Sequence, residues 1–179
     1  MPYDNAKAAL ATASATSTTV GTRQLTALRQ CLVVSSHPQR CESLREAAIE
    51  GGWLPIVFAD AELAWDESRR SVMPLVVVDV HDAADRPAVA CRQLVERLSR
   101  ESGRLLAVCG GDAMPPQDEI WARQLGAWMV MPGIVDAHDV ASVYEEAGKV
   151  IERSEAAAIP SIPHARRGPA RHGTRRRAR

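Results

Sequence analysis

Five short apolar runs alternate with five segments that have the pattern of an amphipathic helix, and this alternation limits the possible fold more than any other feature. We predict strands over 31–36, 54–60, 73–80, 104–111 and 127–134. We predict helices over 39–52, 61–71, 86–103, 115–126 and 136–157. Strands that alternate with helices in this way favour one parallel sheet with helices on both faces and right-handed crossovers.

The third run, MPLVVVDV, shows no alternation between apolar and polar residues, which is typical of a strand buried on both faces at the centre of a parallel sheet. We therefore predict an α/β doubly wound sheet in the order 2-1-3-4-5. This order places the carboxyl ends of the first and third strands side by side. Three of the predicted helices have a stripe that should face the sheet. The stripes are Cys41, Leu44, Ala48 and Ile49 in helix 39–52, Leu63, Ala64 and Ser68 in helix 61–71, and Val140, Val143, Ala147, Val150 and Ile151 in helix 136–157.

The chain has 179 residues, of which 46% are apolar, so one domain with a sizeable core is expected. We expect a flexible leader rich in Ala, Ser and Thr over 1–27, the folded domain over 28–157, and a disordered Arg-rich tail over 158–179. Residues 164–179 hold seven Arg and no acid, which leaves a net charge of −7 on the rest. The tail either stays solvated, binds nucleic acid or an acidic partner nonspecifically, or folds back onto the acidic domain.

The spacing of the cysteines and the lengths of the apolar runs indicate the cellular compartment of the protein. The four Cys contain no C-x-x-C pair, and two of them lie within apolar runs, which suits a reducing compartment. No apolar run reaches the roughly 18 residues that span a bilayer, and no secretory signal pattern opens the chain. We expect a cytoplasmic protein.

Four of the predicted strands end at positions whose residues can be compared with those of a known family. The first strand runs into Ser35 and Ser36, the third ends at Asp79, the fourth holds Cys109, and the fifth reaches Met131 before a proline. The spacing and the apolar context of these positions resemble a response-regulator receiver domain of the chemotaxis-regulator type, over roughly residues 28–154. The resemblance implies a flavodoxin-like fold. It also implies that Asp79 matches the phosphorylatable aspartate.

The resemblance also implies an acidic pair, a hydroxyl residue and a lysine that this chain lacks. Ser35 and Ser36 stand where the acidic pair belongs, Cys109 where Thr or Ser belongs, and Met131 where Lys belongs. Mg²⁺ needs carboxylate oxygens, and phosphoryl transfer depends on neutralising charge. We therefore predict a degenerate pocket of Ser35, Ser36, Asp79, Cys109 and Met131 with no catalytic residue, no metal and no cofactor. Asp79 would be hydrogen-bonded to Ser35, Ser36 or nearby backbone, unless it remains an acceptor or contacts a ligand.

Other candidate sites are less specific. His37, His81, Asp79 and Asp82 could converge on zinc, although solvated loop residues are the simpler interpretation. The run VCGGD (108–112) could cradle a phosphate but lacks the spacing of a nucleotide-binding loop, so we interpret it as a turn. Trp121 and Trp128 mark either core or an interface, because the region of the fourth helix, fifth strand and fifth helix is the usual partner or dimer face in receivers.

These observations favour a non-catalytic pseudo-receiver that acts as a protein-interaction module in signalling or regulation. Its partners would be other proteins or a second copy of the chain. Two alternatives stay open. One is a conventional phosphorelay receiver phosphorylated on Asp79. The other is a doubly wound enzyme or small-ligand binder that uses the crevice at the strand ends.

Overall fold

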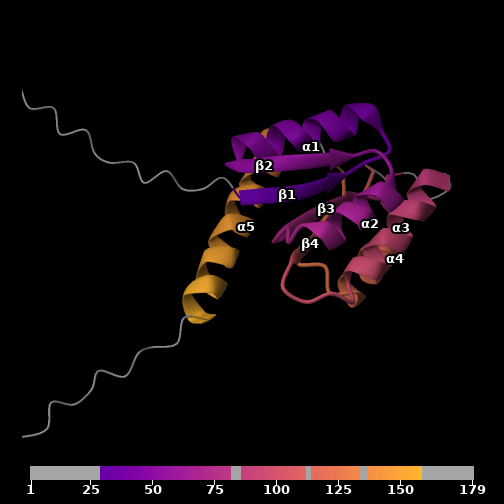
Figure 1. Ribbon diagram of the computed structural model, residues 1–179. Helices are drawn as coiled ribbons and strands as arrows, with labels where there is room; N and C mark the ends of the chain where they lie inside the picture. The colour runs from indigo at the N-terminus through magenta and orange to yellow at the C-terminus, as the bar shows by residue number, and fades with distance from the viewer. Residues whose placement is uncertain (1–28, 82–85, 112–113, 134–136, 159–179) are drawn as a thin grey trace, which may run out of the picture.

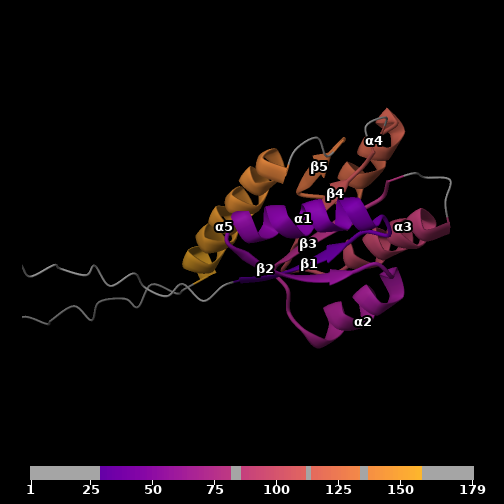
Figure 2. The ribbon, with the colours of Figure 1, turned by 90° about the horizontal axis from the view of Figure 1, so that it is seen from above.

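The computed structural model describes residues 29–81, 86–111, 114–133 and 137–158, which form a five-stranded parallel sheet between two layers of helices (Figure 1, Figure 2). The strands are β1 (Arg29–Val34), β2 (Trp53–Phe58), β3 (Leu75–Asp79), β4 (Leu105–Cys109) and β5 (Met129–Met131). The helices are α1 (Pro38–Glu50), α2 (Ala61–Arg70), α3 (Arg86–Leu98), α4 (Pro116–Gln124) and α5 (Ala137–Ala158). The strand order is β2-β1-β3-β4-β5, which confirms the predicted fold class and order.

The apolar core divides into two clusters, one on each face of the sheet. One cluster joins the sheet to α2, α3 and α4, and the other joins it to α1 and α5. Strand β3 lies in the middle of the sheet, and all five of its residues are buried. Its unbroken apolar run is explained by this position, because a central strand covered on both faces has no solvent-facing side chains.

Two predicted inward residues point outward instead. Ile49 is 51% exposed and Leu63 is 58% exposed. In α1 the buried side chains are Leu44, Ala47 and Ala48, and Ile49 lies roughly 140° around the helix from Leu44, since each residue advances about 100°. The same geometry turns Leu63 away from the sheet, because Ala61, Ala64 and Ser68 form the buried stripe of α2.

The packing of α1 against α5 depends on a residue that the sequence pattern did not single out. Tyr144 is 1% exposed, and its backbone oxygen accepts a hydrogen bond of 2.8 Å from Trp53 Nε1. A Cβ atom added at Gly51 would lie 2.5 Å from Tyr144 Cβ and 2.9 Å from the Ala141 oxygen. Gly51 is therefore required for the close approach of these two helices.

We predict that replacing Gly51 with Ala destabilises the protein by about 1–3 kcal/mol, because the added methyl group forces α5 away from α1. The matched control is Gly148→Ala in α5, where the nearest heavy atom to an added Cβ is Arg29 Nη1 at 3.9 Å. Removing a helical glycine there should stabilise the protein by roughly 0.5–1 kcal/mol. Urea unfolding measures both changes. Equal effects of the two substitutions would contradict this account of α1–α5 packing.

Candidate functional site

The sheet register brings four of the predicted pocket residues to its carboxyl edge. Val34 pairs with Val78, so Ser35 follows β1 beside Asp79 at the end of β3. Asp79 pairs with Cys109, and Cys109 pairs with Met131. Ser36 lies one residue beyond this row and is half-exposed. The predicted residues are thus neighbours in space, and Asp79 lies at the centre.

Asp79 is a buried carboxylate with hydrogen-bond donors at both oxygens. Only 3% of the surface of Asp79 is exposed. Ser35 Oγ donates to Asp79 Oδ2 at 2.7 Å, which confirms one of the hydrogen bonds expected from the sequence. The backbone N–H of His81 donates to Oδ1 at 3.2 Å. Burial of a charge is tolerated when such partners replace water, but neutral donors alone are weak compensation.

The compensating charge comes from Arg40, a residue that the sequence analysis did not identify as part of the site. Arg40 Nε donates to Asp79 Oδ2 at 2.8 Å and Nη2 donates to Oδ1 at 2.9 Å. This is the bidentate, charge-assisted geometry in which guanidinium binds carboxylate most specifically. The side chains of the pair are 12% and 1% exposed, so solvent screens them little. An internal cation therefore lies against the Asp79 carboxylate.

Local structure explains how Arg40 reaches Asp79. Helix α1 begins at Pro38 directly after the carboxyl end of β1, so its first turn overhangs the strand ends. Arg40 lies in this first turn. Its Nη2 also donates to the Gly110 oxygen at 2.7 Å, in the segment that follows β4. One guanidinium thus joins the first turn of α1, the tip of β3 and the exit from β4.

Neither Cys109 nor Met131 contributes a charge to the site. Cys109 is fully buried, and burial raises the pKa of its thiol well above its usual value. The nearby Asp79 charge raises this pKa further, and Arg40 lowers it. The thiol is therefore neutral at physiological pH. Met131 is half-buried, and its backbone oxygen accepts a hydrogen bond of 2.9 Å from the Gly110 N–H. Its thioether packs against the apolar cluster of α1 and α5.

The zinc hypothesis gains no support from the described residues. The rings of His37 and His81 lie edge to face with centroids 5.6 Å apart. Among residues 29–81, 86–111, 114–133 and 137–158, no group of three His, Cys, Asp or Glu side chains is placed to hold a metal. Asp82, the fourth candidate ligand, lies outside these residues.

The glycines after β4 behave as a packed turn. The Gly110 N–H and oxygen are both hydrogen-bonded, to Met131 and Arg40 respectively. A Cβ atom at Gly110 would meet the side chain of Met114, and one at Gly111 would lie 2.6 Å from His81 Nδ1. Neighbouring side chains therefore fill the space beside both glycines and would have to shift to admit a Cβ atom. Asp112 lies outside the described residues.

The two candidate interface tryptophans are each half-buried, and other groups partly cover them. The Arg92 guanidinium lies 4.8 Å from the centroid of Trp121 and also pairs with Asp118, so it links α3 to α4 over the ring. Trp128 precedes β5 and packs against the apolar cluster of α1 and α5. Ile120, also on α4, is 54% exposed and adds apolar surface to this side of the protein.

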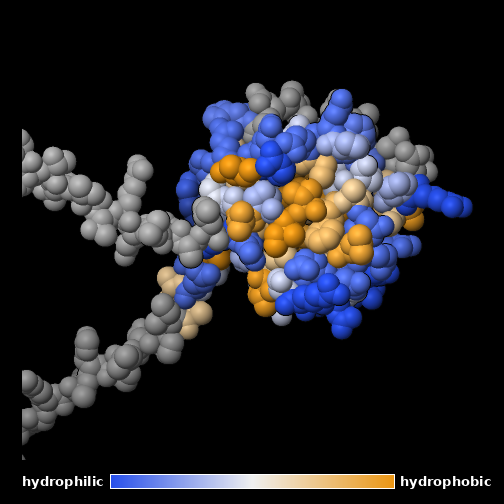
Figure 3. All heavy atoms as spheres, turned by 45° about the horizontal axis from the view of Figure 1, so that its top comes forward, coloured by the Kyte–Doolittle hydropathy of each residue, from blue (hydrophilic) through white to orange (hydrophobic). Residues whose placement is uncertain are grey.

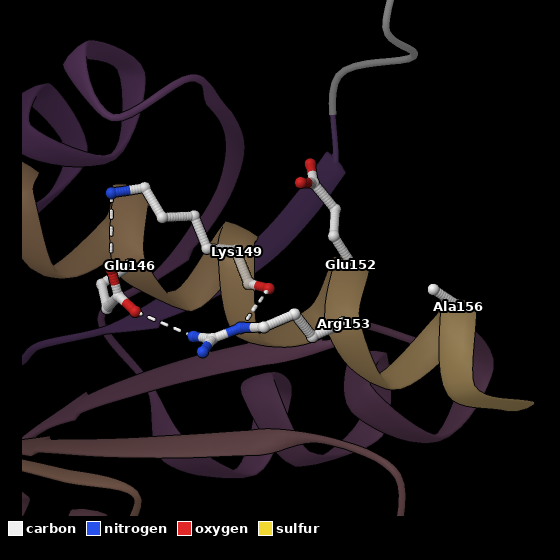
Figure 4. Close-up of a pocket in the computed structure, with 5 residues that line it drawn as sticks. All are labelled: Glu146, Lys149, Glu152, Arg153 and Ala156. Carbon is white, nitrogen blue, oxygen red and sulfur yellow. Dashed lines mark hydrogen bonds and ion pairs between the residues drawn. The ribbon is translucent and has the colours of Figure 1, made fainter.

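A shallow hollow lies on the outer face of α5 (Figure 4). It is lined by Glu146, Lys149, Glu152, Arg153 and Ala156. Glu146 pairs with Lys149 and with Arg153, as the dashed lines show. Glu152 pairs with Arg29 at the start of β1, which places the hollow at the amino edge of the sheet. It therefore gives no support to a ligand crevice at the carboxyl ends of the strands.

No helix in the described ranges is long and apolar enough to cross a membrane. No protein-family model matches the sequence, and no curated protein matches it.

Solved structures of response-regulator receiver domains share this fold. A receiver domain protein (CheY-like) from Methanospirillum hungatei is 15% identical, with a TM-score of 0.58 over 73% of this chain and 98% of that one. An orphan response regulator of H. pylori is 16% identical, with a TM-score of 0.55 over 66% and 95%. NtrX from Brucella abortus is 16% identical, with a TM-score of 0.60 over 72% of this chain but only 28% of that one. The chain therefore has the receiver fold.

We predict that Arg40→Ala destabilises the protein by about 3–5 kcal/mol, because it leaves the Asp79 charge buried without its partner. The matched control is Arg45→Ala on the same helix, since Arg45 pairs with Glu42 at the exposed surface. That change should have little effect on stability, because solvent screens an exposed ion pair. Urea unfolding of Arg40→Ala, Asp79→Ala and the double variant should give a coupling energy above roughly 1.5 kcal/mol. Additive effects would show that the two side chains do not interact.

Proposed function

We propose that this chain is a phosphorylation-independent receiver-like module that binds other proteins in a signalling or regulatory assembly in the cytoplasm. The observation that carries the proposal is the bidentate pair of Arg40 with Asp79. Both carboxylate oxygens already accept charge-assisted hydrogen bonds, so neither is free to attack an incoming phosphoryl group. The acceptor position is filled by the protein's own side chain.

The composition of the pocket supports the same conclusion. Ser35 and Ser36 replace the carboxylates that would hold Mg²⁺, and Met131 has no ammonium group to contact a phosphoryl oxygen. Cys109 is a poorer hydrogen-bond donor than Thr or Ser. Phosphoryl transfer is catalysed mainly by positioning and charge neutralisation, so these substitutions together remove most of the catalytic contribution. Arg40 compensates for the buried charge of Asp79, but it does so by occupying the carboxylate.

The proposed partner surface is the region of α4, β5 and α5. Trp121 and Trp128 supply aromatic area there, and Ile120 supplies an exposed apolar side chain. Aromatic residues with partly exposed faces are common anchors of protein interfaces. The Arg-rich residues 164–179 lie outside the described structure, and we propose that they add nonspecific, salt-sensitive attraction to an acidic partner or a nucleic acid.

The first test asks whether Asp79 is phosphorylated. The full chain is incubated with acetyl phosphate and Mg²⁺ and its intact mass is measured, with a phosphorylatable receiver as the positive control for the reagent. We expect no gain in mass, because Arg40 and Ser35 already occupy the carboxylate. A gain of one phosphoryl group that disappears in Asp79→Asn would establish the conventional receiver instead.

The second test asks whether partner binding depends on the proposed surface and not on phosphorylation. Tagged full-length chain is used to capture proteins from its native cell, alongside Asp79→Asn, Trp128→Arg and Ile120→Arg. We expect specific partners to be retained by Asp79→Asn and lost with Ile120→Arg, which changes an exposed side chain and leaves the core intact. Trp128→Arg should lose the same partners. Capture that is equal for all surface variants, or that is lost with an Asp79→Asn variant whose circular dichroism shows it still folded, would contradict the proposal.

A further inference from the structure

The two helix layers of the protein differ in net charge. Helices α1 and α5 pack on the same face of the sheet, and together they carry eight acidic residues. Four basic side chains are paired with acids of this group, namely Arg29 at the start of β1, Arg45, Lys149 and Arg153. Arg40 is balanced by Asp79 at the strand ends. The layer of α1, α5 and Arg29, which we call the α1–α5 layer, therefore has a net charge of −4.

The opposite helix layer has no net charge. Residues 60–70, 86–104 and 116–124 form α2, α3, α4 and the turns beside them, and they carry eight acidic and eight basic residues. Among the remaining described residues only Asp79 and Arg40 are charged, and their charges cancel. All of the net negative charge of the described chain therefore lies on the α1–α5 layer, which attracts cationic groups more strongly than the opposite layer does.

Part of this negative charge is directly accessible. Glu46 on α1 and both Asp139 and Glu145 on α5 are exposed, and none of them forms an ion pair within the described ranges. Figure 3 shows mostly hydrophilic side chains over α1, at the top of the view. A hydrated carboxylate at such a surface can accept hydrogen bonds from a guanidinium group without displacing an existing partner. The exposed face of the layer therefore suits a cationic, polar ligand.

A cationic segment of the same chain begins just after α5. Residues 164–179 hold seven Arg and no acid, and only residues 159–163 separate them from Ala158, the last residue of α5. A continued helix would carry these arginines away from the domain, but Pro160 and Pro163 oppose helix continuation. The 22 residues of α5 span about 33 Å, whereas the chain after Ala158 can extend to about 70 Å. It is therefore long enough to return along α5 and reach α1.

We propose that the Arg-rich residues 164–179 bind the α1–α5 layer of their own chain. The attachment to α5 keeps the tail at an effective concentration of roughly millimolar, so pairs that are weak between separate molecules can form within one chain. The seven arginines exceed the net charge of the layer, so the bound tail keeps some positive charge. A nucleic acid or an acidic partner then has to compete with this layer for the tail. The contact itself does not depend on the proposed binding of partner proteins.

Amide nitrogen-15 NMR of the full chain tests the contact. The wild type is compared at about 20 mM NaCl with a variant of the same length in which the seven tail arginines are replaced by Gln. We expect amide shifts to differ in α1 and α5 and to agree in α2, α3 and α4, because the contact lies on one layer. The differences should fade at about 500 mM NaCl, where the Debye length falls to roughly 4 Å.

Tryptic cleavage within the tail, followed by mass spectrometry, tests which acids hold it. Glu46→Gln/Glu145→Gln removes two exposed acids of the α1–α5 layer, and Asp66→Asn/Glu96→Gln removes two exposed acids of α2 and α3; no ion pair within the described chain involves any of the four. A synthetic peptide of residues 159–179 gives the cleavage rate of the free tail. At low salt we expect the wild type to be cleaved more slowly than the peptide. The Glu46→Gln/Glu145→Gln variant should be cleaved about threefold faster than the wild type, and the Asp66→Asn/Glu96→Gln control should match the wild type.

Three results would overturn the proposal. Identical amide shifts of the wild type and the Gln variant in α1 and α5 at low salt would show that the tail does not touch this layer. Equal cleavage of the two acid variants would show that the tail has no preference for the α1–α5 layer. Shift differences that disappear on dilution would place the contact between two chains. None of these results concerns partner capture, so failure here is distinct from failure of the proposed function.

Discussion

The ion pair between Arg40 and Asp79 is the constraint on which the rest of the site depends. A carboxylate at the centre of a parallel sheet needs a cation, because removal of its charge from water is expensive. Arg40 supplies this cation from the first turn of α1 and also hydrogen-bonds to the Gly110 oxygen. The chain therefore balances its buried aspartate with its own arginine, which occupies both carboxylate oxygens.

This arrangement links the fold to the proposed function. The strand ends, the glycine turn after β4 and the first turn of α1 are held by hydrogen bonds within the chain. These three segments are thus tied to one another by polar contacts around Asp79. A scaffold fixed in this way offers a constant surface, which suits a protein whose partners are to be bound at all times and not only after phosphorylation.

The sheet order was predicted from the alternation of strands and helices. The row of Ser35, Asp79, Cys109 and Met131 was predicted from the resemblance to receiver domains, and the strand register brings these residues together. The sequence did not predict Arg40, because an arginine in the first turn of an amphipathic helix resembles any solvated residue. A cation within reach of the carboxyl edge was the available signal. The inward faces of α1 and α2 were misjudged at Ile49 and Leu63, because an apolar residue beside the buried stripe fits the helical period loosely and yet faces solvent.

The most direct measurement of the central claim is nitrogen-15 NMR of the arginine side chains in the full-length protein. The pairing of Arg40 with both oxygens of Asp79 predicts restricted rotation of its guanidinium, with separate Nη signals and a slowly exchanging Nε proton, all of which change in Asp79→Asn. Exposed Arg70, which has no ion pair within the described part of the chain, supplies the rotating reference. An Arg40 guanidinium that rotates and exchanges as freely as that of Arg70 would contradict the claim.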